Sequence, residues 1–527
     1  MVRNVIDKQF ERRLAGLINS GERNVLRGGR KGVERESLRV SQSGEIVQTP
    51  HPRELGAPLT NEHITTDFSE SLIELVTPPF QHAWELLQYL CDIHQFVYRH
   101  LGDEMLWATS MPSALRGEDS IPLARFGTSN VGRMKTIYRN GLGLRYGRIM
   151  QAISGVHFNF SFSSHLWDVL EYFNQSKRSR QDFISEQYFA VLRNYRRYGW
   201  LVLYLFGTSP AVSKSFFAGR EADLPMLDSD TFYQPFATSL RMSDIGYRNR
   251  NQAAVPVSVN SLAEYLRDLR RAMHQPHAPF DALGMKRDGE YRQLSVSALQ
   301  VENEYYSFIR PKRVPRTGER TGQALARAGV EYVEVRALDN SVFDPLGVDL
   351  PRLYFLELLL ALLLLKDSPP IDATEEEASE RNHLLVARRG RELGLVLERG
   401  GRRTPLAAWA AELFDSMQGL CEILDARRAD RPYSGALRDQ LAKVEDPGRT
   451  PSARVLRELE QHGQSFEDFS LRISREHRAY CLAEIRPEAT RRAEFESEVQ
   501  ESLEELASLE SAQRGSFEDY LAAYLAD

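Results

Sequence analysis

Two carboxylates two positions apart, Glu34 and Glu36, lie in a segment whose composition favours a β-strand. Side chains of a strand alternate between its faces, so the two carboxylates and Leu38 share one face, with the carboxylate positions about 7 Å apart. Like charges this close repel, so the strand gains stability by turning them to water or by holding a divalent cation. Taken alone, the segment fits a solvated strand face better than a metal site.

Pairs of charged or polar side chains that share one strand face occur on other predicted strands too, and each of these strands has an apolar opposite face. The pairs are Glu34 and Glu36, Asp67 and Glu74, His157 and Asn159, Glu302 and Glu304, and Glu334 and Arg336. This repetition predicts one sheet with a core side and a charged concave side.

The types of side chain on that charged side indicate its chemistry. Hard oxygen ligands with one histidine suit Mg²⁺ or Mn²⁺ better than zinc. Four arginines in the same part of the chain suit phosphate or carboxylate groups: Arg139, Arg241, Arg310 and Arg336. Metal-binding carboxylates with arginines and no phosphate loop indicate metal-assisted phosphoryl transfer.

Several other kinds of site are excluded. The sequence has no Gly-Lys dipeptide and so no Walker A loop, and it has neither HExxH nor GxSxG. The glycines at 141, 143 and 147 miss the dinucleotide-binding spacing and do not follow a predicted strand. A net charge of −6 provides no basic field for nucleic acid.

Composition predicts a soluble cytoplasmic protein. The 527 residues are 42% hydrophobic and 27% charged, enough for a large core and more than one domain. Cys91, Cys421 and Cys481 form no CxxC motif, which fits a reducing compartment. The most apolar run, residues 354–365, is interrupted by Glu357 and is too short to span a bilayer, so we expect a buried helix.

Apolar spacing predicts the elements that carry these residues. We expect an amphipathic N-terminal helix, further helices over 83–101, 183–206 and 261–273, and strands over 32–40, 72–77, 150–162, 294–309 and 329–336. Residues 102–147, rich in Gly, Ser, Pro and Arg, are predicted to form a long ordered loop. Beyond Pro369-Pro370 amphipathic helices dominate, so we place a domain boundary near residue 368 and expect the acidic last forty residues to be a solvated helical surface.

Six blocks of the sequence resemble the proteobacterial-type glutamate–cysteine ligase family, in the family's order. They are GVERESLRV at 32–40, ITTDFSE at 64–70, FGTSN at 126–130, ISGVHFNF at 153–160, IRPKR at 309–313 and EYVEVR at 331–336. The resemblance covers roughly residues 25 to 350 and implies an α+β fold. That fold is a funnel of mainly antiparallel strands related to glutamine synthetase and flanked by helices. It would form a catalytic domain over 1–368, followed by a helical region over 369–527.

The resemblance also implies ATP-dependent ligation of the γ-carboxylate of L-glutamate to the amine of L-cysteine, the first step of glutathione synthesis. Metal-site positions for Mg²⁺ (or Mn²⁺) match Glu34, Glu36, Asp67, Glu74, His157 and Glu334. Arg241 and Arg336 match positions that contact glutamate or the transferring phosphoryl group, and Arg310 and Lys312 are candidates for the ATP phosphates. The cysteine pocket matches Phe68, Tyr138, Arg139, Leu142, Gln151, Tyr247 and Tyr306.

The implied chemistry passes through a γ-glutamyl phosphate, which must be kept from water, and residues 102–147 are the candidate closing loop. Two alternatives remain open at this point. The same scaffold could ligate glutamate to a different amine or act as a guanidino phosphotransferase. The chain could also be a non-catalytic metal- or nucleotide-binding protein. The sequence does not fix the oligomeric state.

Overall fold

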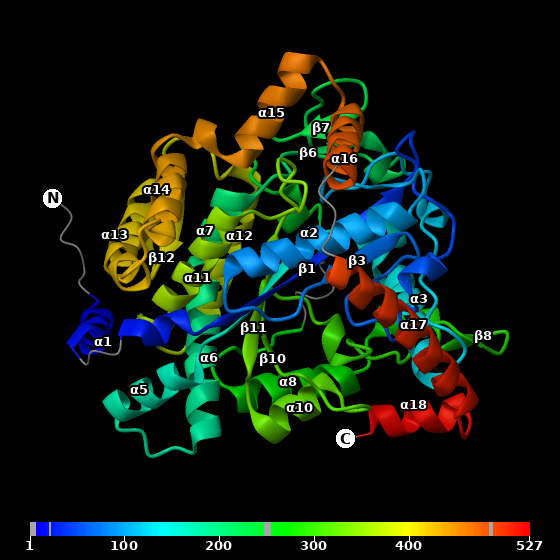
Figure 1. The fold of residues 1–527 in the computed structure, drawn as a ribbon, viewed down its shortest axis with the longest axis horizontal. Helices are drawn as coiled ribbons and strands as arrows, with labels where there is room; N and C mark the ends of the chain where they lie inside the picture. The colour runs from blue at the N-terminus through cyan, green and yellow to red at the C-terminus, as the bar shows by residue number, and fades with distance from the viewer. Residues whose placement is uncertain (1–6, 20–22, 247–254, 484–488, 527) are drawn as a thin grey trace.

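The architecture is built around an antiparallel sheet whose central strand carries Glu34 and Glu36. The computed structural model describes residues 7–19, 23–246, 255–483 and 489–526. Within these residues the main sheet has seven strands in the order β10-β11-β5-β1-β3-β2, with β4 paired to the end of β1 (Figure 1). Their bounds are β1 Arg30–Val40, β2 Ile64–Thr66, β3 Leu72–Val76, β4 Met105–Leu106, β5 Val156–Ser161, β10 Ile309–Lys312 and β11 Tyr332–Leu338.

The apolar face of this sheet is covered by helices. Val33, Phe158 and Val335 are completely buried on this side, as alternation predicts. The covering helices are α2 (Ala83–His100), α6 (Arg180–Tyr198), α7 (Trp200–Phe206) and α11 (Leu350–Leu365). Helix α11 is a buried core helix, as predicted from its apolar run. Among the described residues, no helix combines the length and apolarity needed to cross a membrane.

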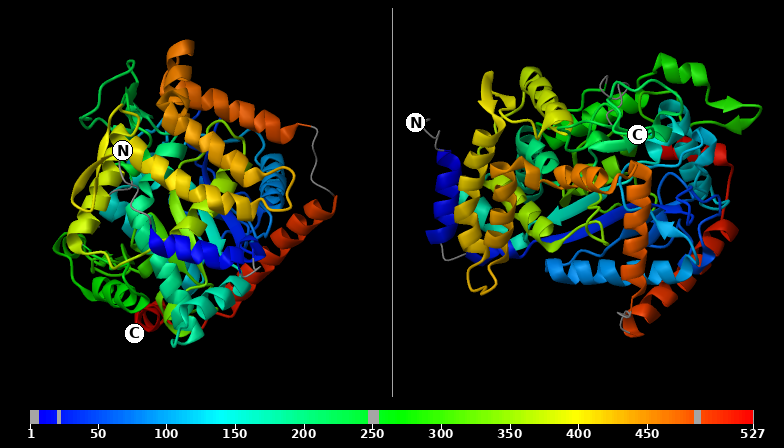
Figure 2. Two further views of the ribbon diagram at one scale, coloured as in Figure 1. Left: turned by 90° about the vertical axis from the view of Figure 1, so that its left-hand side faces the viewer. Right: turned by 90° about the horizontal axis from the view of Figure 1, so that it is seen from above.

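Helices from the second part of the chain pack around this core. Helices α12 (Ala373–Arg389), α13 (Leu406–Leu424) and α14 (Pro432–Glu445) contact α7 or α11. Helices α15 (Pro451–His462) and α16 (Phe466–Leu482) follow, and α16 lies against α2. Helices α17 (Ala489–Ser511) and α18 (Phe517–Leu525) contact α2 and α3 respectively, at the opposite end of the molecule from α1 and α13 (Figures 1 and 2). The boundary near 368 stays a prediction.

The remaining helices and strands are short or peripheral. The helices are α1 (Lys8–Asn19), α3 (Asn130–Tyr146), α4 (Arg148–Gln151), α5 (Ser164–Asn174), α8 (Leu262–His274), α9 (Ala278–Leu283) and α10 (Thr321–Ala328). Three small hairpins pair β6 (Ala211–Ser213) with β7 (Thr231–Tyr233), β8 (Lys286–Arg287) with β9 (Glu290–Tyr291), and β12 (Val396–Arg399) with β13 (Arg402–Pro405). The last pair lies beyond residue 369, in the part of the chain for which only helices were predicted.

The predicted helices 83–101 and 261–273 and the predicted strands 32–40, 72–77 and 329–336 are confirmed within a few residues at their ends. Three other predictions were wrong. The predicted strand 150–162 begins only at Val156, because Ala152 donates its backbone N–H to Arg148 and Ile149 and closes the helical turn α4. The predicted helix 183–206 is broken at Gly199 into α6 and α7.

The predicted strand 294–309 is the third error. Its acidic part forms a 3-10 turn at Glu302–Glu304, and pairing begins only at Ile309. The Glu304 carboxylate is drawn inward, where it accepts hydrogen bonds from Arg145 (2.9 Å) and Tyr146 (2.7 Å).

The predicted long loop 102–147 ends in a regular helix, α3. Its N-cap, Ser129, accepts a hydrogen bond from the amide of Gly132 at 3.2 Å. Gly132 lies so close to the backbone of Phe126 that an added Cβ would sit 2.2 Å from that carbonyl oxygen. The glycine-rich composition that suggested a loop therefore serves close packing at the start of a helix.

Candidate active site

The strand register alone brings the predicted charged residues together. On β1, Glu36 lies opposite Glu74 of β3, and Glu34 lies opposite His157 of β5. Glu334 of β11 lies opposite Asn159 of β5 on one side and Arg310 of β10 on the other. Because residues directly opposite each other project from the same face, these side chains share the polar face of the sheet and form one staggered row across it.

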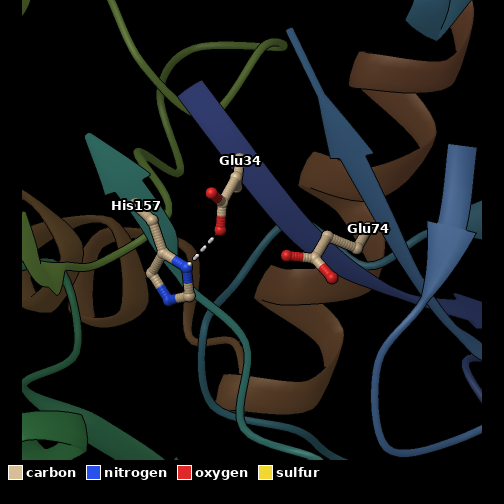
Figure 3. Close-up of side chains that lie close together, drawn as sticks. All are labelled: Glu34, Glu74 and His157. Carbon is tan, nitrogen blue, oxygen red and sulfur yellow. Dashed lines mark hydrogen bonds and ion pairs between the residues drawn. The ribbon is translucent and has the colours of Figure 1, made fainter. Parts of the chain in front are cut away.

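Three members of this row form a candidate metal centre. Glu34, Glu74 and His157 each offer one ligand atom, and these atoms lie within 4.8 Å of one another. Figure 3 shows the three side chains converging from three neighbouring strands. The Nδ1 atom of His157 lies 3.0 Å from Oε2 of Glu34, and Asn159 donates a hydrogen bond to Oε1 of Glu34 at 2.8 Å. Asn159 therefore orients a candidate ligand.

Negative charge is concentrated at the β3 side of the row. Burial, and then the charges of Glu34, Asp67 and Glu36, raise the pKa of Glu74 well above its ordinary value. Burial likewise raises the pKa of Glu36, because the opposing charge of His157 offsets the loss of water only in part. A cation held between these carboxylates would relieve this repulsion, so the donor set fits a divalent metal ion.

Positive charge is concentrated at the β11 side. Although burial opposes it, Lys312 and Arg336 with further cations hold the pKa of Glu334 well below its ordinary value. Arg336 donates to Oε1 of Glu334 at 3.0 Å, and Nζ of Lys312 lies 3.5 Å from Oε2. Arg241 donates to the backbone carbonyl of Arg336 at 3.3 Å and lies 3.7 Å from Asp339. The site thus has an acidic half beside a half rich in cations.

Comparisons with known proteins decide which family this arrangement belongs to. A family model described as glutamate–cysteine ligase matches residues 14–386. Glutamate–cysteine ligase of Azotobacter vinelandii is 48% identical over 520 residues, covering 98% of each chain, and that of Pseudomonas aeruginosa is 46% identical over 517 residues, again covering 98% of each. The chain belongs to the glutamate–cysteine ligase family. The resemblance drawn from the six sequence blocks is therefore confirmed.

A solved structure confirms the fold of this glutamate–cysteine ligase family member. The chain superimposes on the glutamate–cysteine ligase of Francisella tularensis, solved in complex with AMP, with a TM-score of 0.89 and 35% identity. The match covers 94% of this chain and 97% of the other. The predicted α+β fold with a mainly antiparallel, glutamine synthetase-like sheet and flanking helices is thus correct.

The polar face of the sheet forms the floor of a cavity of about 390 Å³. The predicted residues that line it are Glu34, Glu36, Asp67, Glu74, Tyr138, Arg139, Leu142, Gln151, His157, Arg241, Tyr306, Arg310, Lys312, Glu334 and Arg336. The individual roles assigned to them stay predictions. Gln151 reaches the cavity from the helical turn α4 instead of the predicted strand.

Two predicted pocket residues are not among those that line the cavity. Phe68 is 1% exposed and belongs to a hydrophobic cluster, with its ring close to Gly143 of α3. It therefore lies in the core below α3 and not on the cavity surface. Tyr247 lies outside the residues that the structure describes.

The cavity also has lining residues that the sequence analysis missed. They are Met134, Lys135, Tyr146, Met150, Leu294, Val301, Asn303 and Tyr524. Glu304, which was predicted on the charged side without a specific role, lines the cavity too. Burial, and then the charge of Arg139, lower the pKa of Lys135 to about 8. Lys135 is three positions before Tyr138 and four before Arg139, so helical spacing would have selected it if residues 130–146 had been assigned as a helix. Tyr524 has no such local signal.

Proposed function

We propose that this chain catalyses the ATP-dependent ligation of L-glutamate, through its γ-carboxylate, to the amine of L-cysteine, the first step of glutathione synthesis. Membership of the glutamate–cysteine ligase family supports the reaction, and the AMP complex of the Francisella tularensis relative supports a nucleotide substrate. The observation that carries the proposal is one cavity that combines the Glu34, Glu74 and His157 cluster with Arg241 and Arg336.

Mg²⁺, or Mn²⁺ in its place, is the proposed cofactor. Glu34, Glu74 and His157 would hold one ion. Glu36, Asp67 and Glu334 line the same cavity and are proposed to serve further ions. Such ions would neutralise the phosphate oxygens of ATP during transfer. The mixed oxygen and nitrogen donors and the repulsion among the carboxylates are the features of this chain that fit them.

The arginines would act on the transferring phosphoryl group. Arg336 is held by its ion pair with Glu334, and Arg241 by its hydrogen bond to the backbone of Arg336, so both guanidinium groups are fixed before substrate binds. Preorganised cations stabilise charge that develops in the transition state without a cost for reorganisation. Arg310 and Lys312 of β10 are proposed to contact the ATP phosphates.

The γ-carboxylate of glutamate would attack the terminal phosphorus of ATP, and ADP would leave as the bond to that phosphorus breaks. The resulting γ-glutamyl phosphate carries a good leaving group in place of a poor one. The cysteine amine would then attack the acyl carbon, and phosphate would leave. Tyr138, Arg139 and Leu142 of α3, together with Gln151 and Tyr306, are proposed to bind cysteine. Exclusion of water, which we predicted for a loop over 102–147, would fall to the wall formed by α3. We also propose that the enzyme works in the cytoplasm on small molecules alone.

A phosphate-release assay with varied acceptor amines tests the proposal. The purified chain would be incubated with ATP, Mg²⁺ and L-glutamate, and with L-cysteine, L-alanine, glycine, ammonia or no acceptor. We expect cysteine to give the highest turnover and γ-glutamylcysteine to appear in equal amount to the phosphate released. Release with another amine but not with cysteine would favour the alternative ligase, and phosphorylation of a guanidino compound would favour the phosphotransferase.

A further inference from the structure

One wall residue of the cavity comes from a part of the chain far from the rest. Among the described residues that line the cavity, Tyr524 of α18 is the one contributed by the helical region after residue 368. The acidic end of the chain was expected to be a solvated surface, yet Phe517 and Leu521 of α18 are only 2% and 3% exposed. Together with Tyr524 they occupy one face of the helix at spacings of four and three residues.

Helix α18 is fixed along its whole length. At its start, the Phe517 ring lies 4.6 Å from the guanidinium of Arg133 of α3 and 5.1 Å from the Tyr291 ring. At its end, Arg320 donates a hydrogen bond to the backbone carbonyl of Ala526 at 3.1 Å. Contacts at both ends hold the Tyr524 ring in one place at the edge of the cavity.

The helix that α18 covers, α3, forms much of the same wall of the cavity. Lys135, Tyr138, Arg139 and Leu142 of α3 all line the cavity. Helix α3 also contains Gly132, Gly141 and Gly143, each costing roughly 1 kcal/mol of helix stability relative to alanine. Its position therefore depends on packing against its neighbours, and α18 supplies part of that packing.

The part of the wall where α3 meets α18 is apolar, in contrast to the charged floor. Met134, Leu294, Val301, Tyr138 and Tyr524 belong to one apolar cluster. Burial, and then the charge of Glu302, raise the pKa of Tyr524 to about 12, so its ring is neutral near pH 7. The charged floor suits phosphates, metal and the carboxylates of glutamate, whereas this wall suits a small uncharged side chain.

We propose that Tyr524 is a specificity-determining residue that completes, with Tyr138, the pocket for the side chain of the acceptor amino acid. The proposal rests on the proposed function, because the assignment of Tyr138 to cysteine comes from it. The acceptor class is a small amino acid with an uncharged side chain, of which cysteine is the substrate expected here. Helix α18 acts as a support that keeps α3 and the Tyr524 ring at a fixed separation.

Steady-state kinetics of Tyr524→Ala, Tyr524→Phe and Tyr520→Ala test this proposal. Tyr520 is the matched control, because it lies on the same helix and in the same cluster but is not among the residues that line the cavity. For Tyr524→Ala we expect the KM for cysteine to rise about tenfold, while kcat and the KM values for glutamate and ATP stay within about twofold. Tyr524→Phe, which keeps the ring, and Tyr520→Ala are expected to stay within about twofold of the unaltered chain in every constant.

Three outcomes would overturn the proposal: an unchanged cysteine KM in Tyr524→Ala, a fall confined to kcat, or an equal rise for glutamate or ATP. An equal effect of Tyr520→Ala would also overturn it, since loosening of α18 would then be sufficient. If Tyr524→Ala does not fold, Tyr524→Leu keeps apolar volume without the flat ring, and the same criteria apply. The unaltered chain is assayed first, because lack of cysteine-dependent turnover there refutes the proposed function itself.

Discussion

The two faces of β1 both carry buried charges, and they differ in how these charges are paired. On the core side, Lys31 forms a 2.7 Å ion pair with Glu357 of α11, and Tyr433 donates to the same carboxylate at 3.0 Å. Arg39, on the same side, pairs with Glu104 at 2.7 Å. Lys31 and Arg39 therefore have carboxylate partners supplied by the fold, and a third buried cation on this side, Arg35, donates to the backbone carbonyl of Pro345 at 3.0 Å.

On the cavity side, carboxylates outnumber nearby cations at one end of the row. Glu34, Glu36, Glu74 and Asp67 line the cavity with His157, and burial together with the charges of the other three carboxylates raises the pKa of Glu74. Burial alone therefore does not distinguish the two faces. The difference is how far the protein itself supplies the opposite charge. Arg139 lies 3.3 Å from Asp67, but among the described residues Glu36 and Glu74 form no ion pair with lysine or arginine, and this indicates a bound cation.

The largest effect is expected from Glu74→Gln, which removes one charge from the cavity side. Turnover should fall roughly 10³-fold, because that charge acts on the transition state through the bound metal. The free energy of unfolding in metal-free buffer should stay equal or increase, because repulsion is relieved. Cysteine-dependent phosphate release and chemical denaturation measure the two quantities. Glu331→Gln is the control, since Glu331 is 45% exposed and lies outside the row, and it should retain turnover within about twofold.

The opposite pattern is expected for Glu357→Gln on the core side. Removing one partner of a pair that is 1–2% exposed leaves the Lys31 charge uncompensated and should lower the free energy of unfolding by about 3–5 kcal/mol. Turnover per folded molecule should stay within about twofold at a temperature well below unfolding. Glu398→Gln, which breaks the exposed pair with Arg381, should cost no more than about 1 kcal/mol. A large loss of turnover with stability intact would contradict the structural role of Glu357.

Stabilisation by metal should depend on the carboxylates of the cavity side of β1 and not on those of the core side. Mg²⁺ or Mn²⁺ at a concentration of 100 times its dissociation constant should stabilise the unaltered chain by about 2.7 kcal/mol, and chelation should reverse the change. The stabilisation should be lost in Glu34→Gln and retained in Glu357→Gln. Thermal unfolding with and without metal provides the measurement, and isothermal titration gives the affinity. Equal stabilisation of Glu34→Gln would exclude Glu34 as a ligand.

The smallest effect concerns a carboxyl group near the core side of β1. Burial raises the pKa of Asp344 from 3.8 to about 6, although the Leu346 amide opposes this rise. Between pH 4 and 6 the folded chain keeps a proton that the unfolded chain releases, so stability falls as the pH rises through this range. Above pH 6 this contribution is constant.

Asp344→Asn removes that titration. The stability of this variant relative to the unaltered chain should increase from pH 4 to pH 6 and then level off, as followed by chemical denaturation at several pH values. A flat difference across this range would show that Asp344 does not titrate as its burial implies.

Much of the candidate site could be predicted from the sequence, because strand alternation is a strong local signal. Glu34 and Glu36 share a face in any extended strand, and Glu334 and Arg336 follow the same rule. The partner strands could not be predicted from spacing alone, since register depends on contacts between distant segments. The resemblance to a family supplied that information for Glu74 and His157.

The errors have a common physical origin. Residues 150–155 and 294–308 alternate in polarity, which predicts strands. Their backbone N–H and C=O groups form hydrogen bonds in helical turns or with side chains instead of with a neighbouring strand, so no strand forms. The glycines of α3 suggested a loop because glycine has a low helix propensity. Helix propensity does not include the close packing that glycine permits in the folded protein. Tyr524 could not be found, because a short helix with three aromatic residues near the acidic end of the chain gives no sign that it reaches a cavity built from strands.

The floor of the cavity and Tyr524 are far apart in the sequence, and this affects the order in which parts of the site form during translation. The last strand of the floor ends at Leu338, and Tyr524 follows 186 positions later. At roughly 5–20 residues per second, a ribosome delivers it on the order of ten to forty seconds afterwards. A nascent chain can therefore assemble the charged floor well before its acceptor wall is complete, so selectivity for the amine would be the last property of the site to form.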